Sequence, residues 1–231
     1  MGQASNQYVA PTDSSDLFST HLYTGTGAAQ TITNGIDLAG EGGLTWIKAR
    51  NVAYGHQLYD TVRGAGYYLE TNATMASTAE AGGVTSFNSN GFSIGTDAPL
   101  NNNNTNFVSW TFRKAPKFFT CLTYTGNGAS SQTISHDLNT TVGMLVVKRT
   151  DASGEGWEVY HRGVTFNAGN RLRLNLTNAL ATGSGAFSSA PTSTEFFVGP
   201  DSATNASGGT YVAYLFAHNN NDGEFGPDAD Q

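Results

Sequence analysis

The carboxylate side chains are candidates for catalysis, because two of them facing each other across a cleft could cut a glycosidic bond. A β-strand would present such a pair if acidic residues alternated along it, since side chains two positions apart share a face. The acidic residues of this chain do not alternate in that way. Asp60, Glu70 and Glu80 are scattered, and Glu155 and Glu158 flank an expected turn. The sequence therefore predicts no glycosidase site and no enzyme.

Histidine, cysteine and serine patterns predict neither a metal site nor a nucleophile. The five histidines, at positions 21, 56, 136, 161 and 218, form no His-x-His or His-x-x-x-His pair. Cys121 is the single cysteine, so no disulfide can form within the chain, and its strand-like neighbours indicate a buried thiol. Residues 182–185 (TGSG) lie in a small-residue stretch without the strand-to-helix context of a nucleophilic serine. We expect no bound metal and no cofactor.

The acidic C-terminal tail, residues 218–231, is rich in oxygen ligands and resembles pieces of a calcium loop. Its spacing does not match the twelve-residue loop with Gly at position six and Glu at position twelve. We interpret the tail as solvated, and calcium binding by Asp222, Glu224, Asp228 and Asp230 stays open as the alternative.

Sugar binding is the chemistry that the side chains near loops favour most. Aromatic faces stack on sugar rings, and asparagine amides bond to sugar hydroxyls. The candidate contacts are Tyr54, Tyr67, Tyr68, Trp157, Asn101, Asn102, Asn103 and Asn104. Core packing is the competing interpretation for Trp157, and the favoured one for Trp46 and Trp110.

The composition excludes several classes of protein. Of the 231 residues, 38% are hydrophobic and only 13% are charged, with 28 glycines, as expected for a turn-rich all-β protein. The net charge of −7 argues against a nucleic-acid surface, which needs clustered Lys and Arg. No signal peptide and no stretch of about 20 apolar residues is visible, so we expect no membrane insertion.

The elements that must position these side chains occur twice along the chain. Residues 22–27 (LYTGTG) return 101 positions later as residues 123–128 (TYTGNG). Residues 30–32 (QTI), 43–48 (GLTWIK) and 107–112 (FVSWTF) return in the same order as residues 132–134 (QTI), 143–148 (GMLVVK) and 211–216 (YVAYLF). Ordered landmarks over a whole period predict a tandem duplication. We expect an arm at 1–16, repeats at 17–116 and 117–217, and a tail at 218–231.

Each repeat has the pattern of short strands joined by tight turns. Residues 44–50 carry apolar groups on both faces, which predicts a central strand covered on both sides. The Asn-Gly step in residues 88–91 predicts a hairpin, residues 101–104 an exposed loop, and residues 73–80 a loop with a one-turn helix as the alternative. About eight strands per repeat favour a jelly-roll-like β-sandwich.

The last strand of each repeat has one strongly apolar face. Val108, Trp110 and Phe112 alternate along the first copy. The matching positions of the second copy are Val212, Tyr214 and Phe216. Because this face stays apolar in both copies, we expect it to form the core of each sandwich.

Taken together, these motifs resemble a repeated domain of virion structural proteins from tailed bacteriophages. The resemblance covers residues 17–226 and also rests on residues 58–64 (LYDTVRG), 86–92 (SFNSNGF), 113–119 (RKAPKFF) and 208–218 (GGTYVAYLFAH). It implies a lectin-like sandwich, without catalytic residues, on the surface of a virion.

Two roles on the virion follow as expectations. The first is a tail-fibre or adhesin-type module that attaches to a glycan of the host surface. The second is a capsid decoration protein that stabilises the shell. Either role implies contacts with other virion proteins and a homo-oligomer.

Overall fold

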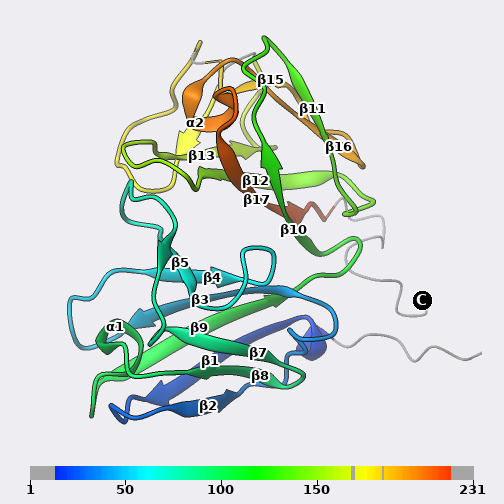
Figure 1. Cartoon of the computed structure of the whole chain (residues 1–231). Coiled ribbons are helices and arrows are strands. Elements are labelled where there is room, and N and C mark those ends of the chain that lie inside the picture. The colour runs from blue at the N-terminus through cyan, green and yellow to red at the C-terminus, as the bar shows by residue number, and fades with distance from the viewer. Residues whose placement is uncertain (1–13, 168–169, 184, 220–231) are drawn as a thin grey trace, which may run out of the picture.

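The computed structural model describes residues 14–167, 170–183 and 185–219, and it confirms the all-β prediction. The strands form two bodies, one built before residue 116 and one after it (Figure 1). The predicted arm is described only from Ser14 and the predicted tail only through Asn219, so the calcium alternative lies outside the described residues.

The first body contains nine strands and two single-turn helices within the described chain. These elements are η1 (Ser14–Asp16), β1 (Phe18–Thr24), β2 (Gln30–Thr33), β3 (Gly43–Ala49), β4 (Gln57–Asp60), β5 (Tyr67–Glu70), β6 (Thr78–Ala79), β7 (Val84–Asn88), β8 (Gly91–Ile94), α1 (Ala98–Asn101) and β9 (Asn106–Arg113).

The second body follows the same order with one strand fewer among the described residues. Its elements are β10 (Phe119–Thr125), β11 (Gln132–Ser135), β12 (Val142–Arg149), β13 (Trp157–His161), β14 (Leu172–Arg173), β15 (Phe187–Ser189), β16 (Glu195–Val198), α2 (Ser202–Asn205) and β17 (Thr210–Ala217).

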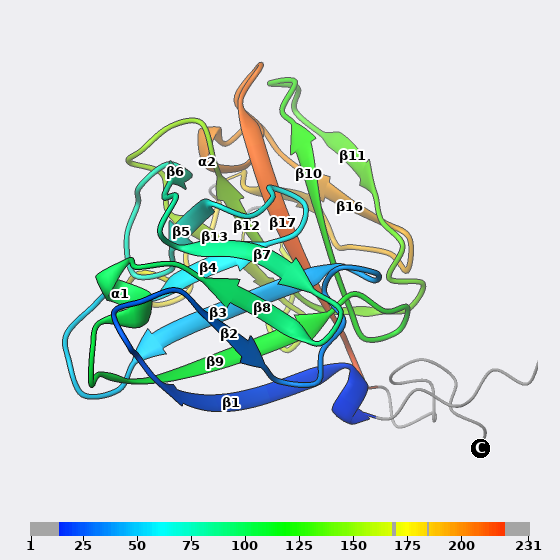
Figure 2. The same cartoon turned by 60° about the horizontal axis from the view of Figure 1, so that its bottom comes forward.

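Each body is a β-sandwich of a larger and a smaller antiparallel sheet. In the first, the sheet β1-β9-β3-β4-β5-β6 faces the sheet β2-β8-β7 (Figure 2). In the second, the sheet β10-β17-β12-β13-β14 faces the sheet β11-β16-β15. The two strand orders therefore correspond sheet by sheet. We call the two bodies the first and the second sandwich.

The local predictions fare differently. The Asn-Gly hairpin is confirmed, since β7 and β8 pair across residues 88–91. The central strand is also confirmed, because β3 lies between β9 and β4 and is buried on both faces. Residues 73–80 contain no helix and end in the short strand β6. The loop predicted at 101–104 is wrong at its first residue, because Asn101 ends helix α1 and is fully buried.

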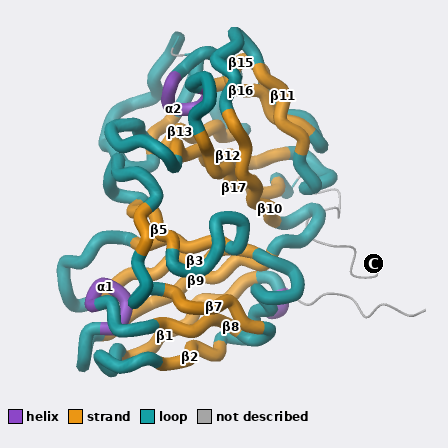
Figure 3. Tube along the Cα trace, in the orientation of Figure 1, coloured by secondary structure: helices purple, strands orange, loops and turns teal. Residues whose placement is uncertain are grey.

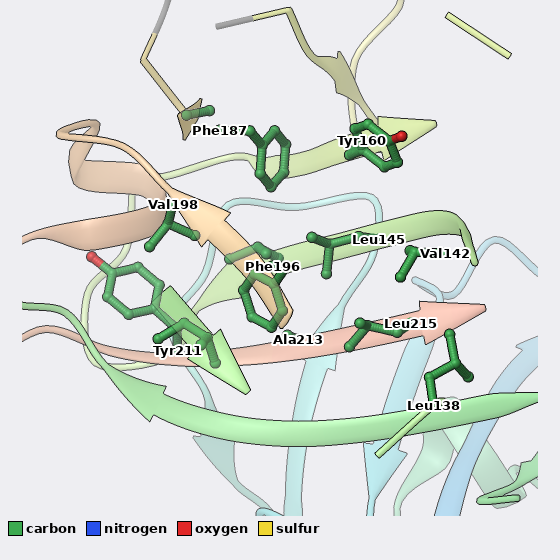
Figure 4. Close-up of a cluster of buried hydrophobic side chains, with 13 residues drawn as sticks. Leu138, Val142, Leu145, Tyr160, Phe187, Phe196, Val198, Tyr211, Ala213 and Leu215 are labelled. Carbon is green, nitrogen blue, oxygen red and sulfur yellow. The ribbon is translucent and has the colours of Figure 1, made fainter. Parts of the chain in front are cut away.

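Each sandwich encloses its own apolar core, whose side chains come from both sheets. The first core includes Ile47 and Phe107 from the larger sheet and Phe92 and Ile94 from the smaller one. The second core is shown in Figure 4, where side chains of β12, β13 and β17 pack against those of β15 and β16. Alternating burial of this kind is what holds two facing sheets together.

The face of β9 and β17 that was expected to form the sandwich cores contributes to the contact between the two sandwiches instead. Phe107 is in the core of the first sandwich, whereas Phe112 packs into a third apolar cluster that contains residues of both sandwiches. The same holds for the second copy, where Tyr211 is in the sandwich core and Val212 and Tyr214 are in the third cluster. The prediction is therefore wrong, because the opposite face fills the sandwich core. On β17 that face is also apolar (Tyr211, Ala213 and Leu215), whereas on β9 Phe107 is buried there beside the small polar side chains of Ser109 and Thr111.

The third cluster joins the two sandwiches. Near the linker, the rings of Phe112, Phe119 and Phe216 pack together, with ring centroids 5.0 to 5.7 Å apart. At the opposite end, the indole Nε1 of Trp157 donates to the backbone oxygens of Glu70 (3.1 Å) and Ala73 (3.0 Å). The sandwiches are thus held at two separate places.

The repeated motif of residues 22–27 ties β1 to helix α1. The hydroxyl of Tyr23 donates to the backbone oxygen of Leu100 at 2.8 Å. A Cβ atom at Gly25 would lie 2.3 Å from the backbone oxygen of Asn102, so a larger residue cannot replace it without a shift. Gly27 has φ of 71°, a conformation that favours glycine.

The second copy of the motif makes the same contacts. The hydroxyl of Tyr124 donates to the backbone oxygen of Thr204 at 2.7 Å. A Cβ at Gly126 would lie 2.4 Å from the backbone oxygen of Ala206, and Gly128 has φ of 70°. The motif recurs because the same turn packs against the equivalent helix in each sandwich, α1 in the first and α2 in the second.

Candidate functional site

Two of the predicted sugar-contact residues are buried and take no part in a surface site. Trp157 is 0% exposed and stacks on Tyr214 with a centroid distance of 6.5 Å. Asn101 is also 0% exposed, and its amide makes hydrogen bonds to four partners around the first repeated turn. The prediction is wrong for both, because their polar atoms are used inside the protein.

Tyr54 and Tyr68 are partly buried and pack against the first sandwich core. The ring of Tyr68 lies 6.0 Å from that of the buried Tyr59. Burial and the carboxylates of Glu70 and Asp97 raise the pKa of the Tyr68 hydroxyl. These half-buried rings pack against the core and are not free to stack on a sugar.

The remaining asparagines lie in the turn between α1 and β9. Asn102 donates from its amide to the hydroxyl of Thr105 at 2.9 Å. Asn103 and Asn104 are exposed, and the backbone N–H of Asn104 donates to the backbone oxygen of Gly25 at 2.9 Å. None of the predicted asparagines lines a described pocket with Tyr67.

Tyr67 is the predicted contact that the structure places at an open groove. The groove has a volume of about 230 Å³ and lies where the two sandwiches meet. It is lined by Val62, Arg63, Tyr67, Ser77, Thr123 and Thr150. Tyr67 is 48% exposed, so part of its side chain is available to a ligand. We call this the Tyr67 groove.

Strand alternation explains the position of Tyr67. It shares a face of β5 with Leu69, which is buried in the cluster between the sandwiches, while Tyr68 faces the first core. Tyr67 pairs with Ala79 of the short strand β6 at the end of the sheet. At this end of the sheet, the Tyr67 side chain lies at the groove instead of inside the cluster between the sandwiches.

Arg63 forms a fixed wall of the groove. Its guanidinium donates to Asp60 Oδ2 at 2.7 Å, to Ser77 Oγ at 2.9 Å and to the backbone oxygen of Leu58 at 3.1 Å. Asp60 is fully buried and also accepts from the hydroxyl of Tyr214 at 2.6 Å. The arginine is thus neutralised and held in place from inside the protein.

Hydroxyl groups from three separate segments complete the groove. The backbone N–H of Ser77 donates to the backbone oxygen of Thr150 at 2.8 Å, which fixes two lining residues across the two sandwiches. Thr123 is exposed on β10, and the Thr150 hydroxyl lies 2.8 Å from that of Thr210. An aromatic face beside hydroxyls and a neutralised arginine suits an uncharged polar ligand such as a sugar.

Sequence reasoning missed Ser77, Thr123 and Thr150. These residues come from loops and strands of both sandwiches, and no local pattern marks them. Hydrogen bonds between residues 74–77 and 150–154 join Ser77 to Thr150 across the two sandwiches, and Thr123 comes to the groove from β10.

The carboxylates considered above do not meet in this groove. Glu158 is 1% exposed and forms ion pairs with Arg171 and Arg173 in the second sandwich. Glu80 accepts from the backbone N–H of Gly82 at 2.9 Å. Among the described residues, no group of three or more His, Cys, Asp and Glu side chains is arranged to hold a metal.

Two further expectations concern burial and membranes. Cys121 is buried, as predicted, and burial raises the pKa of its thiol. No helix within the described ranges has the length and apolar character needed to cross a membrane.

Comparison with known proteins gives one match. A family model described as a domain of unknown function (DUF7483) matches residues 13–227, which is most of the chain and includes both sandwiches. Neither the curated proteins nor the solved structures contain a significant match.

Proposed function

The chain belongs to the DUF7483 family, and from this premise we propose that it is a structural protein on the surface of a tailed-bacteriophage virion. Its role there is attachment to a glycan of the host surface, and the Tyr67 groove is the site that binds the sugar. The protein carries out no reaction in this proposal.

The proposal draws first on the motifs that run through both halves of the sequence. They resemble the repeated domains of phage virion structural proteins, and the family match spans the same residues. A display module needs a rigid scaffold with a site at its surface. Two sandwiches that share an apolar cluster and hydrogen bonds across their contact provide such a scaffold.

The Tyr67 groove carries the binding part of the proposal. A tyrosine ring presents a large, rigid surface at low conformational cost, and it stacks on the apolar face of a sugar. Ser77, Thr123 and Thr150 offer hydroxyl groups beside it. The groove is shallow and without a free charge, so a neutral sugar unit of a longer chain fits it better than a buried small metabolite.

A second candidate function is decoration of the capsid shell. It is favoured by β1, which is the edge strand of its sheet and exposes two apolar side chains, Phe18 and Leu22. Sheet edges with exposed apolar groups are places where another chain can pair or pack. In this role the edge, and not the groove, makes the functional contact.

One set of variants separates the two roles. Tyr67→Ala removes the stacking surface, and we expect binding to host cells or to a host-polysaccharide array to fall at least about tenfold. Tyr67→Phe keeps the ring and should retain most of the binding. Leu22→Ala changes another exposed side chain, outside the groove, and should leave glycan binding intact.

The opposite result identifies decoration. Loss of binding to shells upon Leu22→Ala, with no effect of Tyr67→Ala on cells or glycans, would refute attachment and support the second role. Antibodies raised against the purified chain should label the surface of intact phage particles. If no phage particle is labelled, the virion assignment is wrong for both roles.

A further inference from the structure

A large apolar cavity lies between the two sandwiches, away from the Tyr67 groove. Its volume is about 300 Å³. It is lined by Leu44, Trp46, Leu58, Phe112, Met144, Val146, Trp157, Val159, Leu174, Tyr214 and Phe216. The lining is drawn from the outward faces of both larger sheets. β3, β4 and β9 supply one wall, and β12, β13 and β17 supply the other. Figure 3 shows β3 and β9 of the first sandwich facing β12 and β17 of the second.

The polar atoms of the lining residues are used outside the cavity. Trp157 Nε1 donates to two backbone oxygens at the far end of the contact, and the Tyr214 hydroxyl donates to Asp60. Trp46 Nε1 donates to Nδ1 of His56 at 3.1 Å. A polar group inside the cavity would therefore lose its water without gaining a partner. The cavity therefore favours a hydrocarbon ligand over a polar one.

The cavity cannot close by a simple movement of the two sandwiches. At one end, the rings of Phe112, Phe119 and Phe216 keep the sheets apart. At the other, Trp157 is bonded to the first sandwich, and the backbone N–H of Ser77 is bonded to the oxygen of Thr150. Atoms that line an unfilled space lack contact partners on one side, so an apolar ligand gains contacts that the protein alone cannot make.

Size and access indicate the class of ligand. A dry apolar cavity of about 150 Å³ binds benzene or xenon, so twice that volume accommodates a hydrocarbon group of roughly ten carbon atoms. Six of the lining residues are buried and four are half-buried, and Leu174, which is 42% exposed, marks the mouth. A polar end of the ligand would stay in water beside Leu174.

We propose that this cavity is a binding site for a small apolar ligand, a hydrocarbon ring system or short hydrocarbon chain held between the two sandwiches. It is separate from the Tyr67 groove, and it does not depend on the role proposed above.

Bromobenzene is a suitable probe, because its heavy atom quenches tryptophan fluorescence at short range. Trp46 and Trp157 line the cavity, and the ring of Trp110 lies 6.1 Å from that of Trp46. Titration of the full chain should give saturable quenching. Absence of saturation in the unaltered chain would overturn the proposal.

Two variants locate the binding. Val159→Phe fills part of the cavity and should weaken bromobenzene binding at least about tenfold. Val159→Thr keeps the volume but adds a hydroxyl group, and should weaken binding in the same direction. Val52→Phe adds the same ring at an exposed position outside the cavity, and should bind like the unaltered chain. Equal quenching in all four proteins would refute the site.

A measurement on the unaltered chain covers the case in which the variants fail to fold. Crystals under xenon pressure should show xenon between Trp46 and Val159. Xenon found only elsewhere, or a second copy of the chain seated in the cavity, would overturn the proposal.

Discussion

The two sandwiches share a strand order but bury different polar groups at one equivalent position. In the first, Gln57 of β4 accepts from the hydroxyl of Tyr59 at 2.9 Å and lies 3.5 Å from Asp97, toward which its amide points. The strand registers place Glu158 of β13 at the same position of the second, because Gln57 pairs with Ile47 as Glu158 pairs with Val147. One sandwich uses a neutral amide where the other buries a carboxylate.

The carboxylate of Glu158 requires opposite charges around it. The Nε atoms of Arg171 and Arg173 lie 2.9 and 3.4 Å from its oxygens, and Arg171 also pairs with Asp201. Burial raises the pKa of Glu158 even so, since it outweighs the two arginines. The comparison teaches that the topology fixes where a polar group is buried and leaves open whether it is charged.

A second difference concerns the last residue of the same two strands. Asp60 ends β4 and is buried against Arg63 and Tyr214, whereas His161 ends β13 and is exposed. At this position, only the residue of the first sandwich contacts the other sandwich through a charged group. The two sandwiches have the same strand order, but they contribute different side chains to the contact between them.

The largest expected effect comes from breaking that contact. Asp60→Ala leaves the buried guanidinium of Arg63 without its counter-charge, and we expect it to lower the free energy of unfolding by about 3–5 kcal/mol. His161→Ala, at the equivalent exposed position, should change it by less than about 0.5 kcal/mol. Urea unfolding measures both. Equal effects would mean that Asp60 does not join the sandwiches.

The next effect tests a position at which the two sandwiches agree. Asn101 and Asn205 each hold a repeated turn with a buried side-chain amide, whose oxygen accepts from the backbone N–H of Thr26 or of Asn127, respectively. Replacement of either by Ala leaves these groups unpaired and should lower stability by about 1–3 kcal/mol. Thermal unfolding of the two variants compares them directly, and a loss in only one would show that the turns are not equivalent.

A third prediction concerns Lys148, which lies fully buried on β12 while its counterpart Lys48 is half-buried. Burial lowers the pKa of Lys148 to about 8, from 10.5. The unfolded chain then binds more protons between these values, so stability should rise with pH from about 8 to 10.5, by of order 1–2 kcal/mol.

The test compares the unaltered chain with Lys148→Met. The variant has no ammonium group to bury, so its stability curve should lack this rise between pH 8 and pH 10. If the two curves run parallel, Lys148 keeps an ordinary pKa in the folded protein. Direct observation of the Lys148 ammonium by NMR gives the same pKa independently.

The smallest effect is expected at the exposed edge. Leu22 of β1 pairs with Val108, and Thr123 of β10 pairs with Val212, so the two occupy equivalent positions. Leu22 is 57% exposed, and Leu22→Thr should change the free energy of unfolding by less than about 0.5 kcal/mol. A larger loss would show that Leu22 is buried in an oligomer, which analytical ultracentrifugation of the same samples would detect.

Much of the fold could be read from local patterns. The alternation of apolar residues predicted the strands, and the ordered landmarks predicted two units with strands in the same order. The repeated glycines and tyrosine of residues 22–27 marked a turn whose geometry allows few replacements. These features depend on neighbours along the chain, which the sequence records directly.

The candidate site could be predicted only in part. Tyr67 was among the candidate contacts, but nothing near it in sequence indicates Thr123 or Thr150. Trp157 carried the same aromatic signal as Tyr67 and is buried. Exposure of an aromatic ring depends on what covers its strand, and the covering residues are distant in sequence.

The sequence by itself determined which side chains share a face of a strand, because side chains alternate strictly along extended backbone. Only the tertiary structure decided what each face meets. Val108, Trp110 and Phe112 share an apolar face as expected, yet Phe112 of this face packs into the cluster between the sandwiches, and Phe107 on the opposite face is in the core. On β17 both faces are apolar, so burial of either is favourable, and long-range packing alone selects the partner.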